Sequence, residues 1–464
     1  MRVYNSKSIN LHDKDICFER IEREYNKCYE AFKPLMEKHL KITVDTILKY
    51  IGDSVIAIYL IGSFGRDEGA LYVEKERVEP LRDFDVLVVT TKPTSSDTII
   101  AMTEEIHDKI GIPSPTKSFL EEFSIWITYT LFNDLAKGVP LLKYYELKYS
   151  SKHLYGIDIR PLINLELDDV SLYNGILILL TKIEGLLTLY PLPGIRNTKR
   201  LLNFIYEILK MFTEISTIFS LIDKSIYRPK YSDRCYNFVK VYREKAPWLF
   251  KLLPGLDYYV TFACVRRKLL TKSFVTELNI DSIKFRAIEI LDKVISLYIT
   301  LGYNIKIPLS GFSNSDRKTL DKVGLAILAN FFHDYLRKVF KIQNRTLAKI
   351  LSIGITPFYL LISNISFVLR ARRDGIPVKI TLMFSTKNHF VHIAHIGMVT
   401  LKILAHRNYI ELNQILKLLE KYLDRGYIAS LNGNSINTTM LDIVVKLLSK
   451  LLRLADASLH KKAF

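Results

Sequence analysis

Two short apolar runs, with a turn and two carboxylates between them, constrain this chain more than any other stretch. The first run, Val55 to Ile61, ends at Gly62-Ser63, and the second, Val86 to Val89, follows Asp83-Phe84-Asp85. Both runs are rich in β-branched residues and bounded by turn or charged residues, which predicts two buried strands. We expect the segment from Gly62 to Gly69 to form a tight turn followed by a short helix.

The two aspartates indicate a cation site. Residues two apart in a strand point to the same face, so Asp83 and Asp85 project together while Phe84 turns into the core. Two neighbouring carboxylates repel each other unless a cation lies between them. Magnesium takes such oxygens readily and completes its coordination with water and substrate phosphates. The sequence therefore predicts Asp83 and Asp85 as metal ligands.

The turn before the gap supplies the other half of a site. Gly62 lets the backbone approach a ligand closely, and the amides around Ser63 are suited to phosphate oxygens. Arg66 lies one turn further on, where its guanidinium would reach the same anion. A phosphate cradle and a carboxylate pair on adjacent strands together predict metal-assisted phosphoryl or nucleotidyl transfer.

Ile61-Gly62-Ser63 followed by Asp83-Phe84-Asp85-Val86 resembles the signature of the DNA polymerase beta-like nucleotidyltransferase superfamily. The resemblance covers residues 45 to 160. It implies a short mixed sheet with flanking helices, two Mg²⁺ ions on Asp83 and Asp85, and a nucleoside triphosphate held at Gly62 and Ser63. The gap between Ser63 and Asp83 exceeds the common spacing, and a surface loop from Glu74 to Glu79 is expected to fill it.

The superfamily usually has a third carboxylate on a later strand, and here the candidate strand, Phe123 to Leu131, contains no acid. Glu122 shares a face with Ser124 and Trp126 and is the candidate. The alternative interpretation is that Glu121 and Glu122 are solvated residues at a helix end. The activity expected is Mg²⁺-dependent transfer of a nucleoside monophosphate to a hydroxyl of an RNA end, a protein side chain or a small molecule. The alternative is a catalytically silent protein that binds nucleotide or RNA as a regulator.

Length and periodicity predict the rest of an α+β protein. At 464 residues the chain exceeds the usual size of one domain. We expect a nucleotidyltransferase domain at 1–160, a helical bundle at 161–305 and a mostly helical domain at 318–464, separated by the Pro-, Gly- and Ser-rich segment 307–317. Within this plan Pro34 is expected to interrupt an N-terminal helix, and the segment after Pro377 is expected to form a strand.

Charge is shared unevenly along the chain. Residues 1–160 hold 22 Lys and Arg against 25 Asp and Glu, a net charge of −3. The whole chain is +18, which leaves +21 for residues 161–464. Such a surplus suggests a polyanion partner, either RNA or an acidic membrane surface. The alternative is that the lysines are scattered over solvated helix faces.

Two further features bear on the surroundings of the protein. The four cysteines form no Cys-x-x-Cys pair, so neither a disulfide framework nor a zinc site is expected, and with no apolar segment at the N-terminus a cytoplasmic location is expected. Ile350 to Leu369 contains twenty uncharged residues beside an arginine cluster, long enough to span a bilayer. Its Gly, Pro, Asn and hydroxyl residues favour a buried helix instead.

Overall fold

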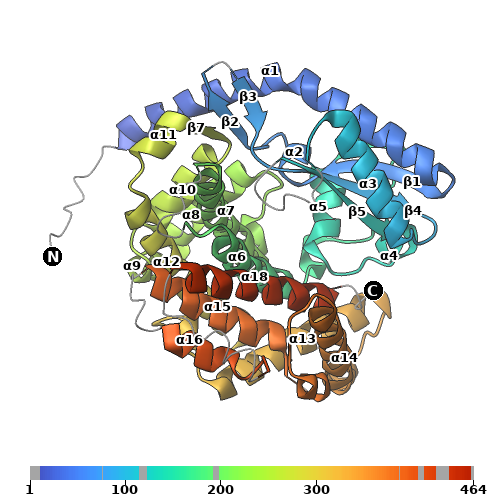
Figure 1. Cartoon of the computed structure of the whole chain (residues 1–464), viewed down its shortest axis with the longest axis vertical. Coiled ribbons are helices and arrows are strands. Elements are labelled where there is room, and N and C mark those ends of the chain that lie inside the picture. The colour runs from blue at the N-terminus through green and yellow to red at the C-terminus, as the bar shows by residue number, and fades with distance from the viewer. Residues whose placement is uncertain are drawn as a thin grey trace.

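The protein has an α+β fold in which a sheet with its covering helices lies over a large helical region (Figure 1). The computed structural model describes residues 11–75, 77–113, 123–191, 198–385, 387–405, 412–424 and 438–460. The predicted fold class is therefore confirmed.

The N-terminal part is built on a four-stranded sheet of order β5-β4-β1-β6. Strand β1 is antiparallel to β4 and to β6, whereas β4 and β5 run parallel. The strands of this sheet are β1 (Val55–Ile61), β4 (Phe84–Thr90), β5 (Ile125–Leu131) and β6 (Lys152–Gly156). The helices are α1 (Leu11–Ile51), α2 (Gly62–Gly65), α3 (Ser96–Ile110), α4 (Phe132–Ala136) and α5 (Leu142–Ser150).

Alternation along β1 and β4 divides their side chains between two cores. Ile58 and Val88 belong to a core that the helices α1 and α3 share. Tyr59 and Leu87 point the other way and belong to the core of the helical region. Because residues two apart share a face, Asp85 points with Leu87 toward the helices that follow in the chain. This parity places the predicted acidic pair between the sheet and the helical region.

The helical region is packed around α6. This helix lies against α7, α15 and α18, so segments from both predicted helical domains contribute to one continuous core. The division at 307–317 remains a prediction. The elements are α6 (Tyr173–Leu189), α7 (Thr198–Ile222), α8 (Tyr231–Lys245), α9 (Pro247–Leu252), α10 (Leu256–Arg266), α11 (Lys272–Glu277), α12 (Ile280–Tyr303), α13 (Arg317–Val339), α14 (Arg345–Arg373), α15 (His389–Ala405), α16 (Leu412–Leu419) and α18 (Thr438–His460).

The sequence predicted that a surface loop from Glu74 to Glu79 fills the long gap between Ser63 and Asp83, and this prediction is wrong. The gap forms a hairpin of β2 (Leu71–Glu74) and β3 (Arg77–Pro80), and β2 also pairs in parallel with β7 (Leu269–Thr271). Leu71 and Leu269 are fully buried where the strands meet. The pairing of β2 with β7 joins residues about two hundred positions apart, so no local sequence pattern predicts it.

Two local predictions are wrong. Helix α1 continues through Pro34 instead of ending there. Proline removes one backbone hydrogen bond, but Phe32 and Met36 on either side bury their side chains in the sheet core and hold the helix together. After Pro377, Val378 makes a single antiparallel bridge to Leu423, and the described chain then turns into a short 3₁₀ helix, η6 (Ile380–Phe384), instead of a strand.

The cysteine prediction is also wrong. Cys235 on α8 and Cys264 on α10 form a disulfide, although 29 positions separate them. The two helices pack against each other and bring the cysteines within reach. Cys28 is a free cysteine.

Candidate active site

The turn after β1 brings its glycine against the acidic pair. Gly62 has φ +70°, a conformation that favours glycine, and Ile61 before it pairs with Asp85 across the sheet. A Cβ atom on Gly62 would lie 2.3 Å from Oδ2 of Asp85, so no larger residue fits without movement. The glycine and the second aspartate, 23 positions apart in the sequence, thus form one surface.

Asp83 and Asp85 lie at the start of β4 and line one cavity. Ser124, just before β5, donates from Oγ to Oδ1 of Asp83 at 2.8 Å. Burial raises the pKa of Asp85 to about 6, and the neighbouring charge of Asp83 adds to the rise. The ionised form of Asp85 is therefore disfavoured, and a cation between Asp83 and Asp85 would stabilise it.

The cavity around the aspartates has a volume of about 290 Å³ and is closed on one side by the sheet and on the other by helices. The sequence predictions Gly62, Ser63, Arg66, Asp83 and Asp85 all line it. The rest of the lining comes from positions that the sequence analysis did not single out: Arg82, Glu146, Tyr206, Glu207, Lys210, Glu214, Tyr231 and Arg267.

Helix α7 supplies the charged wall opposite the sheet. Glu207 accepts from Arg82 at 2.6 Å and from Lys182 at 3.4 Å. Burial alone would raise the pKa of Glu207, but Lys182 and Arg82 outweigh it and lower the pKa to about 2. Burial alone would lower the pKa of Lys210, yet Tyr206 and the glutamates of this helix raise it. Lys210 therefore remains a cation facing the aspartates.

Arg66 occupies a buried cluster. Its Nη1 lies 3.2 Å from Oε2 of Glu146, and its guanidinium stacks 4.2 Å from the ring centre of Tyr231. Arg234 holds the other oxygen of Glu146 at 3.2 Å. The arginine is thus fixed by the start of α8 as well as by its own turn, a structural role that the sequence did not predict. Whether it also contacts phosphate remains a prediction.

Several buried donors around the cavity are unsatisfied. The Nε atoms of Arg66, Arg82 and Arg267 make no hydrogen bond to the described residues. Buried donors without partners cost stability unless a ligand or water meets them. Guanidinium groups are suited to phosphate oxygens. This cluster fits a bound polyphosphate.

The donor chemistry of the acidic pair fits magnesium. Two carboxylates supply hard oxygen ligands, and phosphate and water can complete the coordination. Among the described residues, no group of three His, Cys, Asp or Glu side chains is placed to hold a metal ion. A metal here would therefore depend on Asp83, Asp85 and substrate oxygens.

The third carboxylate is not on the predicted strand. Glu122 lies outside the described residues, so its assignment stays a prediction. In the parallel pairing of β4 and β5, Asp85 is opposite Trp126, whose side chain is 43% exposed. The position beside Asp85 on the neighbouring strand is therefore aromatic. Glu214 of α7 also lines the cavity, and its Oε1 accepts from the Tyr231 hydroxyl at 2.9 Å.

A second cavity, of about 320 Å³, adjoins the first. The two share Glu146, Glu214 and Tyr231 as lining residues. The remainder of the second cavity is mostly apolar and comes from Leu141, Leu142, Lys143, Asn174, Leu177 and Ile178. Glu214 thus lies at the boundary between a charged cavity and a more apolar one.

One signal in the sequence could have identified the α7 residues. Glu207, Lys210 and Glu214 recur at intervals of three and four on a helix whose described side chains are almost all buried. Charged residues on such a stripe must find partners or line a cavity. Their meeting with Asp83 and Asp85 depends on the tertiary fold.

No family model matches the chain, and no curated protein matches it. Among solved structures, the chain is similar to the spectinomycin adenyltransferase of Enterococcus faecialis, determined with ATP and spectinomycin. The identity is 14%, the TM-score is 0.26, and the match covers 50% of this chain and 99% of that one. That neighbour is a nucleotidyltransferase, but a likeness of this size carries no argument about activity, so the function must be argued from the geometry of the site.

Proposed function

We propose that the protein is a Mg²⁺-dependent nucleotidyltransferase that moves a nucleoside monophosphate from a nucleoside triphosphate to a hydroxyl group. The observation that carries this proposal is the contact of Gly62 with Asp85. It joins the turn at Gly62 and Ser63 to a carboxylate pair within one cavity. If Asp83 and Asp85 were only a solvated strand end and Gly62 only part of an ordinary turn, Gly62 would not need to lie so close to the Asp85 carboxylate.

The triphosphate would lie between the turn and the cations of the facing wall. Ser63 offers a hydroxyl and backbone amide at the turn, and Lys210 offers a positive charge from α7. The unsatisfied guanidinium nitrogens of Arg66, Arg82 and Arg267 add further donors. Asp83 and Asp85 would hold Mg²⁺, which would neutralise charge on the phosphates.

The acceptor hydroxyl would enter from the adjoining cavity. Its oxygen forms a bond to the α-phosphorus while the bond from that phosphorus to the oxygen shared with the β-phosphate breaks, so that pyrophosphate leaves. Oε1 of Glu214 accepts from the Tyr231 hydroxyl, and we assign the other oxygen, Oε2, as the group that accepts the hydroxyl proton. A cavity of about 320 Å³ suits a small molecule or a single side chain better than a polymer.

One observation favours the alternative, a catalytically silent protein that binds nucleotide. Trp126 pairs with Asp85 on the neighbouring strand, and β5 (Ile125–Leu131) contains no carboxylate. The alternative predicts nucleotide binding without transfer, and it leaves no role for Glu214.

The proposal is tested by incubating the full chain with nucleoside triphosphates labelled on the α-phosphate and with Mg²⁺. Aminocyclitols, other polyols, hydroxyl-bearing peptides and total RNA would serve as acceptors in parallel reactions. Label in an acceptor together with free pyrophosphate supports transfer. Saturable nucleotide binding with no labelled product under any acceptor would favour the silent alternative, and the absence of nucleotide binding would contradict both.

A further inference from the structure

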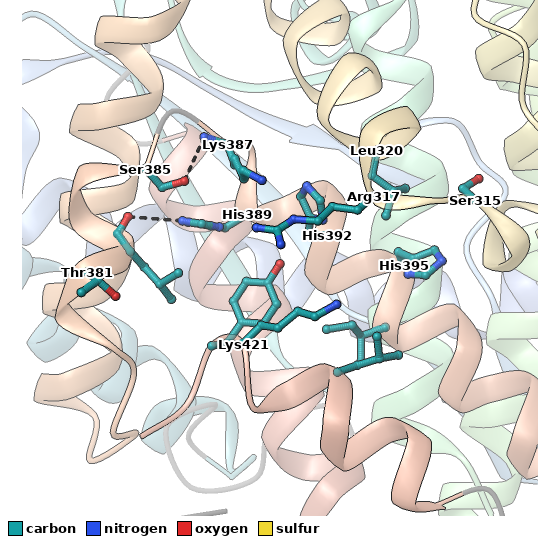
Figure 2. A pocket seen from close by; sticks show the side chains of 14 residues that line it. Ser315, Arg317, Leu320, Thr381, Ser385, Lys387, His389, His392, His395 and Lys421 are labelled. Atoms are coloured by element: carbon teal, nitrogen blue, oxygen red, sulfur yellow. Dashed lines mark hydrogen bonds between the residues drawn. The ribbon is translucent and has the colours of Figure 1, made fainter. Parts of the chain in front are cut away.

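A third cavity, of about 300 Å³, lies in the helical region and shares no lining residue with the candidate active site. It is bounded by the start of α13, by η6, by α15 and by the residues after α16. Figure 2 shows Arg317 and Lys421 reaching into the space beside His389, His392 and His395. With Lys387, three histidines and three cationic side chains therefore line one cavity.

The charges in this cavity are only partly compensated. Asp321 accepts from Lys387 at 3.0 Å and from Nε2 of His392 at 2.8 Å, so its two oxygens are occupied. Arg317 and Lys421 form no ion pair with any described residue. Burial lowers the pKa of His392 and of His395, and this effect outweighs the hydrogen bonds to Asp321 and to the Ser313 carbonyl, which raise the two values. The charges of Lys387 and Arg317 lower the pKa of His392 further.

Two buried polar atoms in the lining are unsatisfied. Oγ of Ser315 and Nδ1 of His389 have no hydrogen-bond partner among the described residues, in side chains that are 7% and 4% exposed. Nε2 of His389 lies 3.3 Å from the carbonyl oxygen of Leu382, so this nitrogen carries the hydrogen. Nδ1 must then accept, and Ser315 is free to donate. Figure 2 draws His389 beside the guanidinium of Arg317 and Ser315 at the opposite end of the cavity. A small ligand beside Arg317 and Lys421 would therefore meet His389, and it needs a hydroxyl to donate to Nδ1.

We propose that this cavity binds a phosphate group, as hydrogen phosphate or as the head of a small phosphate ester. Such a group offers oxygens to Arg317 and Lys421, and a hydroxyl on the phosphate or its ester offers a hydrogen to His389. Bidentate pairing with arginine is a common mode of phosphate recognition. The site stands independently of the proposed transfer reaction.

Isothermal titration of the full chain with inorganic phosphate, and separately with ribose 5-phosphate, tests this proposal. Arg317→Gln and Lys421→Gln should each weaken binding about tenfold or more, because each removes a charged hydrogen bond. Lys417→Gln, on the exposed side of α16, is the matched control and should leave binding unchanged. Absence of binding by both compounds, or equal losses in all three variants, would overturn the proposal.

A separate observation concerns α14, which is long and apolar enough by composition to cross a membrane, with 44% of its most apolar window buried. One face packs on α13, α18 and η6 and carries polar residues such as Ser363 and Asn364. The other face is exposed: Phe358 is 71% and Ile350 is 62% exposed. The sequence favoured a buried helix, but α14 is buried on one face only. Its circumference is not apolar throughout.

The exposed face forms a continuous stripe. Leu347, Leu351, Phe358, Ile362 and Leu369 recur at helical spacing along it. Exposed apolar residues that gather on one face indicate an interaction surface. The same helix has five Lys or Arg residues and no Asp or Glu between Arg345 and Arg373. These cations gather toward its two ends.

From this combination we infer that α14 lies on an anionic membrane surface, with its apolar stripe inserted and its cations at the level of the headgroups. Amphipathic helices rich in Lys and Arg bind such surfaces through buried apolar area and charge attraction. A second copy of the chain is a poorer occupant, because pairing two α14 helices in either direction brings like-charged ends together.

Vesicle flotation of the full chain tests this inference. We expect binding to phosphatidylcholine vesicles that contain phosphatidylserine, little binding to phosphatidylcholine alone, and a decline with added salt. Phe358→Ser and Ile350→Ser should each reduce binding several-fold. Leu301→Ser, at an exposed site on α12, should not. Equal binding by all variants, or a dimer in light scattering that Phe358→Ser dissociates, would overturn the inference.

Discussion

Gly62 and Asp85 stand so close together that a methyl group on Gly62 would lie 2.3 Å from Oδ2 of Asp85. This contact ties the turn after β1 to the acidic pair on β4. A side chain at position 62 would displace the carboxylate that is predicted to hold the metal, and φ +70° adds strain for any residue but glycine.

Gly62→Ala should therefore abolish nucleotidyl transfer and destabilise the fold by about 1 kcal/mol or more. The matched control is Gly111→Ala, because Gly111 has φ +77° but no atom within 4 Å of its Cβ position. Both variants carry the backbone strain, and only the first meets Asp85. Transfer rates and urea denaturation measure the two effects. Equal activity in the two variants would show that the contact has no functional consequence.

Lys210 is expected to bind the triphosphate. Lys210→Gln should weaken nucleotide binding by about 1.5–3 kcal/mol, the usual value for a hydrogen bond to a charged partner. Lys240→Gln, at an exposed position on α8, is the control. Equilibrium titration with a fluorescent nucleotide would measure both. Unchanged affinity in Lys210→Gln would mean that Lys210 serves only to balance the glutamates of α7.

Arg66→Gln should lower stability as well as nucleotide affinity. It removes a buried ion pair with Glu146 and the stacking on Tyr231, and we expect a loss on the order of 2 kcal/mol or more. Arg20→Gln breaks only an exposed pair on α1 and should change stability by less than about 1 kcal/mol. Denaturation of the two variants is the comparison. A stable Arg66→Gln protein would argue against the structural role.

Asp85 should make stability depend on pH when no metal is present. Because its pKa is raised to about 6 in the fold, the ionised form is disfavoured there. The native state then binds the proton more tightly than the unfolded chain does, so stability falls as pH rises from about 4 to about 6. With EDTA present, Asp85→Asn should gain stability relative to the parent over that range. A parallel pH dependence in both proteins would contradict this account.

The sequence predicted the local half of the site. Gly62, Ser63, Asp83 and Asp85 belong to a strand, a turn and a strand start whose patterns are short, and the structure brings them into one cavity. Alternation along the strand also predicted that Asp83 and Asp85 point to the same face, and both line the cavity. What it could not predict is which helix would face the pair, because that depends on the packing of α7 more than a hundred residues later.

The other errors have related causes. The hairpin between Leu71 and Pro80 is stabilised by pairing with β7, and the disulfide by the packing of α8 on α10. Both join distant segments without a local signal. Helix α1 passes through Pro34 because tertiary burial outweighs the loss of one hydrogen bond. Sequence propensity describes the conformation of an isolated segment, whereas tertiary contacts with distant residues determine the conformation of these three segments.

The most direct test of the central claim is the transfer of label from a nucleoside triphosphate labelled on the α-phosphate, in the presence of Mg²⁺, by Asp83→Asn and Asp85→Asn. Each change removes one anionic metal ligand, and circular dichroism establishes that the variants are folded. The account predicts transfer by the parent protein and none above background by either folded variant. Full activity in either one would contradict it.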